Sequence, residues 1–174
     1  MSSYVELWDV LDENGNKSGK IIKRGIPMAQ GEYHLVVDVW IINDKGEFLI
    51  SKRLPTKYPD PGKWNPVCGC AIAGETSIAS ALRETKEELG ISLDIQKGRL
   101  LKRFICGSES IIDVWIFCQN IDINTVILQA EETDDVMWAT AKTIKQMIGN
   151  NDFIHPKRVP YVDELFQSCG QGNE

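Results

Sequence analysis

Three glutamates near the middle of the chain have the residue type and spacing to bind a metal ion. Glu84, Glu87 and Glu88 stand at positions i, i+3 and i+4, so in a helix their carboxylates project from one face. Their mutual repulsion costs roughly a few tenths of a kcal/mol per close pair. Carboxylate oxygens suit Mg²⁺, Mn²⁺ or Ca²⁺ better than zinc. Composition alone favours a solvated charged face, so a metal site depends on what surrounds the cluster.

The surrounding residues predict a helix from Thr76 to Leu89. Thr76 or Ser77 can cap its start and Gly90 can end it. A separate face of this helix carries the residues expected to pack inward, which are Ile78, Leu82, Thr85 and Leu89. The helix can therefore dock on a core while its carboxylates point elsewhere.

The run from Gly69 to Ile91 resembles the Nudix box, in which a glycine, a glutamate, an Arg-Glu pair, a Glu-Glu pair and a final glycine stand at fixed offsets. Seven such identities arise by chance on the order of 10⁻⁹ per start position. Thr85 is the one departure, because the family usually has an aliphatic residue there. The matching positions are Gly69, Glu75, Arg83, Glu84, Glu87, Glu88, Gly90 and Ile91.

This resemblance implies a Nudix (MutT-like) α/β/α sandwich and a hydrolase that uses Mg²⁺, or Mn²⁺, to cleave a diphosphate linkage. It places metal ligands at the Gly69 carbonyl and at Glu84, Glu87 and Glu88. It makes Glu75 and Arg83 an ion pair that positions the helix. Candidates for the catalytic carboxylate are Glu84, Glu87 and, on a later loop, Glu132; Glu131 and Glu132 could equally form a solvated acidic turn.

The segment Trp64–Gly69 also resembles type I isopentenyl-diphosphate isomerase, a relative of the Nudix fold in which the cysteine matching Cys68 is catalytic. Three features of the isomerases are missing. Cys70 stands where they have a metal-binding histidine, residues 25–33 contain no histidine, and residues 110–114 lack their Glu pair. The chain therefore resembles a hydrolase from the branch near the isomerases. Cys68 is either a small strand residue or a substrate contact.

Two basic residues before the box, Lys52 and Arg53, are further candidates for binding substrate phosphates, or else are solvated charges at a strand end. The segment from His155 to Arg158 is expected to be an exposed loop. Trp8 lies in a predicted N-terminal hairpin, where it could cover its own core or pair with a second subunit. A homodimer is therefore compatible with the sequence.

The rest of the chain predicts one Nudix domain over residues 1–174, with an N-terminal hairpin and loop over 1–30 and the box over 69–91. Strands and helices interleave without repeats, which indicates an α/β fold with a mixed sheet between helices. The expected strands are 5–11, 20–24, 33–43, 47–52, 100–106, 111–118 and 136–139, and the expected further helices are 140–148 and 160–167.

Composition narrows the class of protein. The 174 residues are 43% hydrophobic and 25% charged, and the net charge of −6 disfavours nucleic acid as a partner. Five cysteines without paired spacing fit a reducing cytosol, and neither a signal peptide nor a membrane span is visible. We therefore expect a cytoplasmic enzyme with a small-molecule diphosphate substrate. The alternatives are isomerisation of isopentenyl diphosphate and non-catalytic binding of a nucleotide.

Overall fold

A seven-stranded mixed sheet forms the centre of the molecule in the computed structural model, which describes residues 5–170. Five strands follow the order β5-β4-β3-β8-β7, while β6 pairs with β3 and β9 pairs with β4. The strands are β3 (His34–Ile42), β4 (Phe48–Arg53), β5 (Trp64–Asn65), β6 (Val67–Cys70), β7 (Gly98–Cys106), β8 (Ser110–Cys118) and β9 (Thr133–Ala139).

The longest strand, β3, organises this sheet. It pairs in parallel with β8 over its whole length, from His34 to Ile42. Its other edge is shared: β4 pairs antiparallel at Ile41 and Ile42, and β6 pairs antiparallel from Val36 to Val39. The pairing of β3 with β4 is therefore brief, and β4 and β6 pair with separate parts of one edge of β3.

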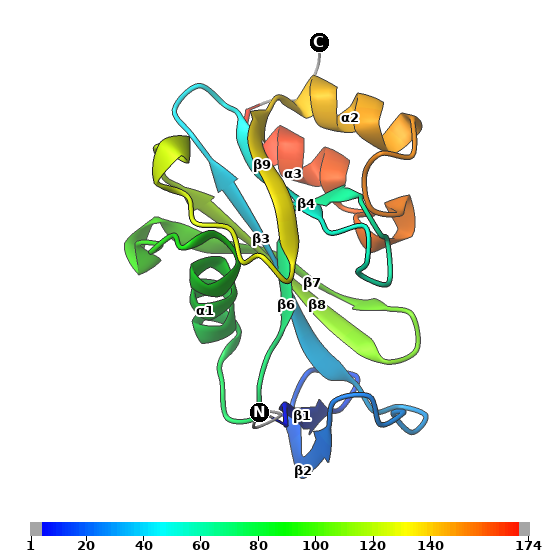
Figure 1. The fold of residues 1–174 in the computed structure, drawn as a ribbon. Helices are drawn as coiled ribbons and strands as arrows, with labels where there is room; N and C mark the ends of the chain where they lie inside the picture. The colour runs from blue at the N-terminus through cyan, green and yellow to red at the C-terminus, as the bar shows by residue number, and fades with distance from the viewer. Residues whose placement is uncertain (1–4, 171–174) are drawn as a thin grey trace.

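Helices cover both faces of the sheet, as Figure 1 shows. Helix α1 (Ser77–Leu89) packs on one face, while α2 (Ala141–Gly149) and α3 (Val162–Ser168) pack on the other. Short 3₁₀ turns lie at η1 (Ile95–Lys97), η2 (Ile123–Thr125) and η3 (Pro156–Arg158). The α/β/α sandwich predicted from the sequence is confirmed. Among residues 5–170, no helix is long and apolar enough to cross a membrane.

Helix α1 begins and ends where local chemistry predicts. Thr76 is the N-cap, and its side chain accepts a hydrogen bond from Ala79 N. Gly90 ends the helix with φ of 70°, which a residue with a side chain adopts at a cost. Thr85 is fully buried, and its hydroxyl donates to the Ala81 carbonyl at 2.8 Å. The polar atom of Thr85 is therefore satisfied inside the core.

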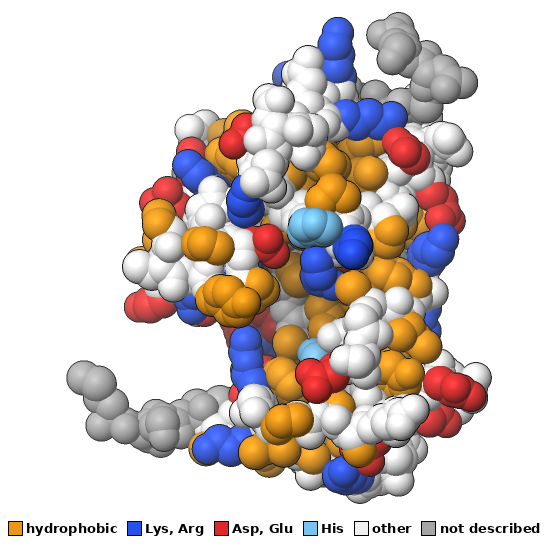
Figure 2. All heavy atoms as spheres, turned by 90° about the vertical axis from the view of Figure 1, so that its right-hand side faces the viewer, with side chains coloured by type: hydrophobic (Ala, Val, Ile, Leu, Met, Phe, Trp, Pro, Cys, Tyr) orange, Lys and Arg blue, Asp and Glu red, His pale blue; other side chains and the backbone are white. Residues whose placement is uncertain are grey.

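The N-terminal hairpin, β1 (Leu7–Leu11) and β2 (Lys17–Lys23), forms a separate two-stranded sheet. Its second strand starts three residues earlier than expected. Trp8 stacks on the ring of His34, with centroids 4.1 Å apart, and both side chains are buried. The hairpin thus covers part of the molecule's own core. Figure 2 shows the face of the molecule that lies on the right of Figure 1, with a hollow between its two histidine side chains.

Candidate active site

The guanidinium group of Arg83, in the middle of the Nudix-like helix, is the centre of a network of carboxylates. It donates to both oxygens of Glu75, at 2.7 and 3.0 Å. It also donates to Glu84 and Glu87, each at 2.9 Å, and to the Cys70 carbonyl at 2.9 Å. One arginine therefore ties α1 to β6 and gathers three of the predicted site carboxylates.

Glu75 is fixed more firmly than a surface ion pair would be. Its Oε2 accepts from Ser80 Oγ at 2.7 Å and from Ile72 N at 3.1 Å. Burial acts to raise the pKa of Glu75, but the hydrogen bonds from Arg83, Ser80 and Ile72 outweigh it and lower the pKa. The predicted pair of Glu75 and Arg83 is present as a bidentate contact.

The N-terminal hairpin supports the loop that carries Glu75. Ala73 N donates to the Leu7 carbonyl at 2.7 Å, and Gly74 N donates to the Asp9 carboxylate at 2.8 Å. Lys17 pairs with the same carboxylate at 2.6 Å and reaches the Glu75 carbonyl at 3.3 Å. The hairpin thus helps to position the box, a role that its sequence did not indicate.

Gly69 and Glu84 lie in direct contact across the gap between β6 and α1. A β-carbon built on Gly69 would stand 1.9 Å from Glu84 Cδ and 2.2 Å from its Oε1. Burial raises the pKa of Glu84 to about 7, although Arg83 acts in the opposite direction. The backbone of the first box residue and a candidate metal ligand are therefore adjacent.

Glu88 lies in a small pocket with Arg53 and Glu132, whose other lining residues are Ser51, Asn65 and Thr133. A backbone hydrogen bond from Cys68 reaches its carboxylate. Burial, together with the charges of Glu84 and Glu132, raises the pKa of Glu88 to about 8, while Arg53 acts against this. The structure thus brings Glu132, expected on a later loop, and Arg53, expected at a strand end, next to the box helix.

Glu132 forms an ion pair with Lys57, which holds its carboxylate near Glu88. Its neighbour Glu131 is exposed. Of these two acidic residues, only Glu132 lines the pocket that contains Glu88.

The basic pair at the end of β4 divides between the two faces of the sheet, because successive strand residues point in opposite directions. Arg53 lies with Glu88, and its Nε donates to the Pro59 carbonyl at 3.0 Å. Lys52 instead lies over the ring of Trp64, 5.9 Å from its centroid. Cys68 is also on the side away from α1, where it packs against the same core cluster as Trp64.

The donor set of this site fits a hard divalent cation. Three carboxylates lie on adjacent turns of α1, and burial raises the pKa of Glu84 and Glu88, which a cation would counteract. Within residues 5–170, no three His, Cys, Asp or Glu side chains already converge on one point. Arg83 engages one oxygen each of Glu84 and Glu87, so these side chains would have to turn their other oxygens to a metal.

The expectation of an exposed loop at His155–Arg158 is wrong for its last residue. Residues 156–158 form η3, and Arg158 is half-buried with its guanidinium against Asp38, Cys68 and Cys106. The local sequence Pro-Lys-Arg does not predict the burial of Arg158, because the partner carboxylate, Asp38, is 120 residues away in the chain.

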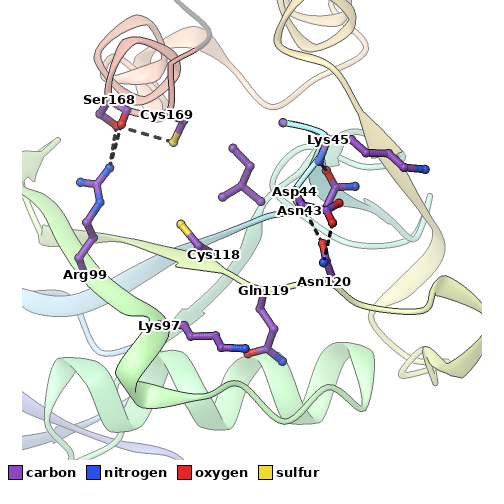
Figure 3. A pocket seen from close by; sticks show the side chains of 12 residues that line it. Asn43, Asp44, Lys45, Lys97, Arg99, Cys118, Gln119, Asn120, Ser168 and Cys169 are labelled. Atoms are coloured by element: carbon purple, nitrogen blue, oxygen red, sulfur yellow. Dashed lines mark hydrogen bonds between the residues drawn. The ribbon is translucent and has the colours of Figure 1, made fainter.

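A larger pocket, of about 620 Å³, lies at another part of the molecule, and Figure 3 shows it from close by. Cys118 and Cys169 point into it, and Arg99 donates to Ser168 at its edge. None of the predicted site residues lines this pocket.

Comparison with known proteins identifies the family. The NUDIX domain pattern matches residues 32–161. A Nudix hydrolase of Listeria innocua is 36% identical over 168 residues, which cover 94% of this chain and 95% of the relative. An isopentenyl-diphosphate Delta-isomerase of Corynebacterium diphtheriae is 30% identical over 144 residues, which cover 77% and 78% of the two chains.

The fold has a solved counterpart. The crystal structure of DR0079 from Deinococcus radiodurans aligns with a TM-score of 0.74 at 23% identity, over 94% of this chain and 99% of that chain. The NUDIX domain covers most of the sequence and a Nudix hydrolase matches nearly its full length, so the chain belongs to the Nudix hydrolase family.

Proposed function

We propose that this enzyme hydrolyses a diphosphate linkage in a nucleoside diphosphate derivative or a related organic diphosphate, and that it requires Mg²⁺, with Mn²⁺ as a substitute. The observation that carries this proposal is the gathering of Glu75, Glu84 and Glu87 around Arg83, beside a pocket that holds Glu88 and Glu132. Binding a ligand without turnover would not demand so many carboxylates in one place. Clustered carboxylates are a poor surface for an anionic substrate unless a cation joins them.

The ion would be held by Glu84, Glu87, Glu88 and the Gly69 carbonyl, and it would neutralise phosphoryl oxygens and lower the pKa of a bound water. Arg83, held by Glu75, positions Glu84 and Glu87 through its hydrogen bonds to them. Arg53 can donate to a phosphate oxygen, because its guanidinium has donors beyond the one used by Pro59.

Glu132 is our choice for the general base, with Glu84 and Glu87 as the alternatives within the box. Its carboxylate lines the same pocket as Glu88, and Lys57 fixes its position. A base in that place can accept a proton from a water that attacks phosphorus next to the box helix.

The test is product release from a panel of diphosphates in the presence of Mg²⁺, comparing wild type with Glu87→Gln and Glu132→Gln. Glu131→Gln is the matched control, because Glu131 is adjacent and exposed. We expect both site variants to lose at least about 10²-fold in kcat/KM and the control to keep its activity. Absence of turnover on every diphosphate, with ligand binding that ignores Mg²⁺, would indicate the non-catalytic alternative.

Isomerisation of isopentenyl diphosphate remains the second candidate, because isomerases are among the relatives. Two residues argue against isomerase activity. Cys70 offers a soft sulfur where the isomerases have a histidine, and Asp113, on the strand where they carry a Glu pair, is buried in an ion pair with Arg103 at 2.6 Å. Conversion of isopentenyl diphosphate that is lost in Cys68→Ser would establish this activity instead.

A further inference from the structure

Strand β6 separates two charged environments. Gly69 faces α1 and contacts Glu84, whereas Cys68 points to the opposite face, where Arg158 donates to its sulfur at 3.4 Å. Among the described strands β6 pairs with β3 alone, and side chains of α1 meet its other edge, Arg83 at the Cys70 carbonyl and Glu88 at the Cys68 backbone. The carboxylates of α1 and the guanidinium of Arg158 are therefore separated by the thickness of one strand.

Glu88 and Arg158 meet this strand at the same residue. The Cys68 backbone forms a hydrogen bond with the Glu88 carboxylate, and the Cys68 side chain accepts from Arg158. Glu88 and Arg158 are therefore both neighbours of Cys68, so a ligand that reaches past this residue can contact the box helix and Arg158 at once.

Arg158 is held in place by a buried carboxylate. Asp38 is fully buried and lies opposite Cys68 in the register of β3 and β6. One of its oxygens accepts from Tyr161 at 2.6 Å, and the other lies 3.5 Å from Arg158 Nη2. Trp40 donates in turn to the Tyr161 hydroxyl at 3.1 Å. This chain of buried contacts fixes the place of the guanidinium.

The guanidinium keeps capacity for an anionic ligand. Of its five N–H donors, three point to Asp38, Cys68 and Cys106, and two have no partner within residues 5–170. Thiol sulfur is a weak acceptor, and the Asp38 contact is long. The side chain is 28% exposed, so these donors can be reached from solvent.

We propose that Arg158 binds a phosphate group of the substrate from the face of β6 opposite α1, and that Asp38 positions it for this contact. The inference rests on the proposed function, since it assigns one phosphate of the diphosphate to the box carboxylates and their cation and the other to Arg158. Arginine suits this role because its planar fork matches phosphate oxygens.

The test measures binding of methylenediphosphonate, a non-hydrolysable diphosphate, by calorimetry in the presence of Mg²⁺. We expect Arg158→Gln to weaken binding tenfold or more, as a lost charge-assisted hydrogen bond does, and Arg158→Lys to recover part of the loss. Lys157→Gln is the matched control, because Lys157 is the exposed neighbour, and its affinity should equal that of wild type.

Arg158→Gln leaves Asp38 buried without its cation and can lower stability, so the double variant Asp38→Asn/Arg158→Gln is tested as well, after its melting curve shows that it is folded. Wild-type affinity in the folded double variant, or no binding of the probe by wild type, would overturn the inference. Failure of the proposed function looks different: no diphosphate is hydrolysed, although binding of the probe still depends on Arg158.

Discussion

Gly69 lies so close to Glu84 that any side chain at position 69 would collide with it, since a β-carbon would stand 1.9 Å from Glu84 Cδ. The glycine is required by this contact and not by its own backbone, which has no left-handed φ. A residue without a side chain lets the candidate metal ligand lie directly on the strand that carries the candidate carbonyl ligand.

Gly69→Ala should therefore damage activity far more than stability. The atoms displaced are the far end of a flexible side chain, so the fold can adjust, but Glu84 must leave its position. A displacement of about 1 Å at a catalytic group can lower the rate about 10²-fold, which kcat/KM with Mg²⁺ measures. Gly149→Ala is the control, because no atom lies within 4 Å of its added carbon. Equal activity of the two variants would contradict the role given to Gly69.

Glu75→Gln should lower both stability and activity, because it removes the charge that Arg83, Ser80 and Ile72 N all stabilise. Loss of a hydrogen bond to a charged group costs about 1.5–3 kcal/mol, measured as the free energy of unfolding in urea.

The stability difference between wild type and Glu75→Gln should depend on pH. The folded-state pKa of Glu75 is lowered from 4.5, so its stabilising contribution is complete above pH 4.5 and is lost as the pH falls below that value. A difference between wild type and variant that persists unchanged at pH 3 would contradict this account.

The sequence predicted the parts of the site that lie within one contiguous segment. The positions from Gly69 to Gly90 have fixed offsets because a helix and the loop before it set their geometry locally, and Arg83 does contact Glu75, Glu84 and Glu87. Periodicity likewise located α1 to within one residue, because Thr76 and Gly90 mark its ends chemically.

Residues that act across the sheet could not be predicted in this way. Arg158 and Asp38 meet only because η3 returns over β3, and no local pattern records that contact. The separation of Lys52 from Arg53 depends on which face of β4 turns toward α1, and two adjacent basic residues do not reveal this. The support of the box by Asp9 and Lys17 depends on where the hairpin docks.

Thr85→Val should leave activity unchanged and stability equal or slightly higher. The Thr85 hydroxyl is buried and donates only to Ala81 O, so removing it leaves no buried donor unpaired, and valine has nearly the same shape. The Ala81 carbonyl keeps its partner within α1, so the change avoids the penalty for a buried polar group that is left unpaired. Thermal melting and kcat/KM test this prediction. A loss of more than about 1 kcal/mol would show that the hydroxyl stabilises the helix beyond its single hydrogen bond.

Glu88→Gln should stabilise the metal-free protein at high pH while weakening its response to Mg²⁺. The folded-state pKa of Glu88 is raised from 4.5 to about 8, so the folded state favours the protonated carboxyl. Wild type should therefore lose stability relative to the variant as the pH rises from 4.5 to about 8, and the difference should be constant above that range. For a chain of this length, about 1 kcal/mol moves the melting temperature by about 2–4 °C.

Mg²⁺ should reverse this order, because a cation at the carboxylates stabilises the ionised form that the metal-free fold disfavours. Melting curves at pH 8.5 with and without Mg²⁺ are the measurement: wild type should gain several degrees from the ion and Glu88→Gln should gain less. The gain of wild type should shrink at pH 6, where protons compete with the metal for Glu84 and Glu88, whose pKa values are about 7 and 8. Glu131→Gln, at an exposed position, should follow wild type in every condition. A gain from Mg²⁺ that is the same in Glu88→Gln and at both pH values would show that the ion binds elsewhere.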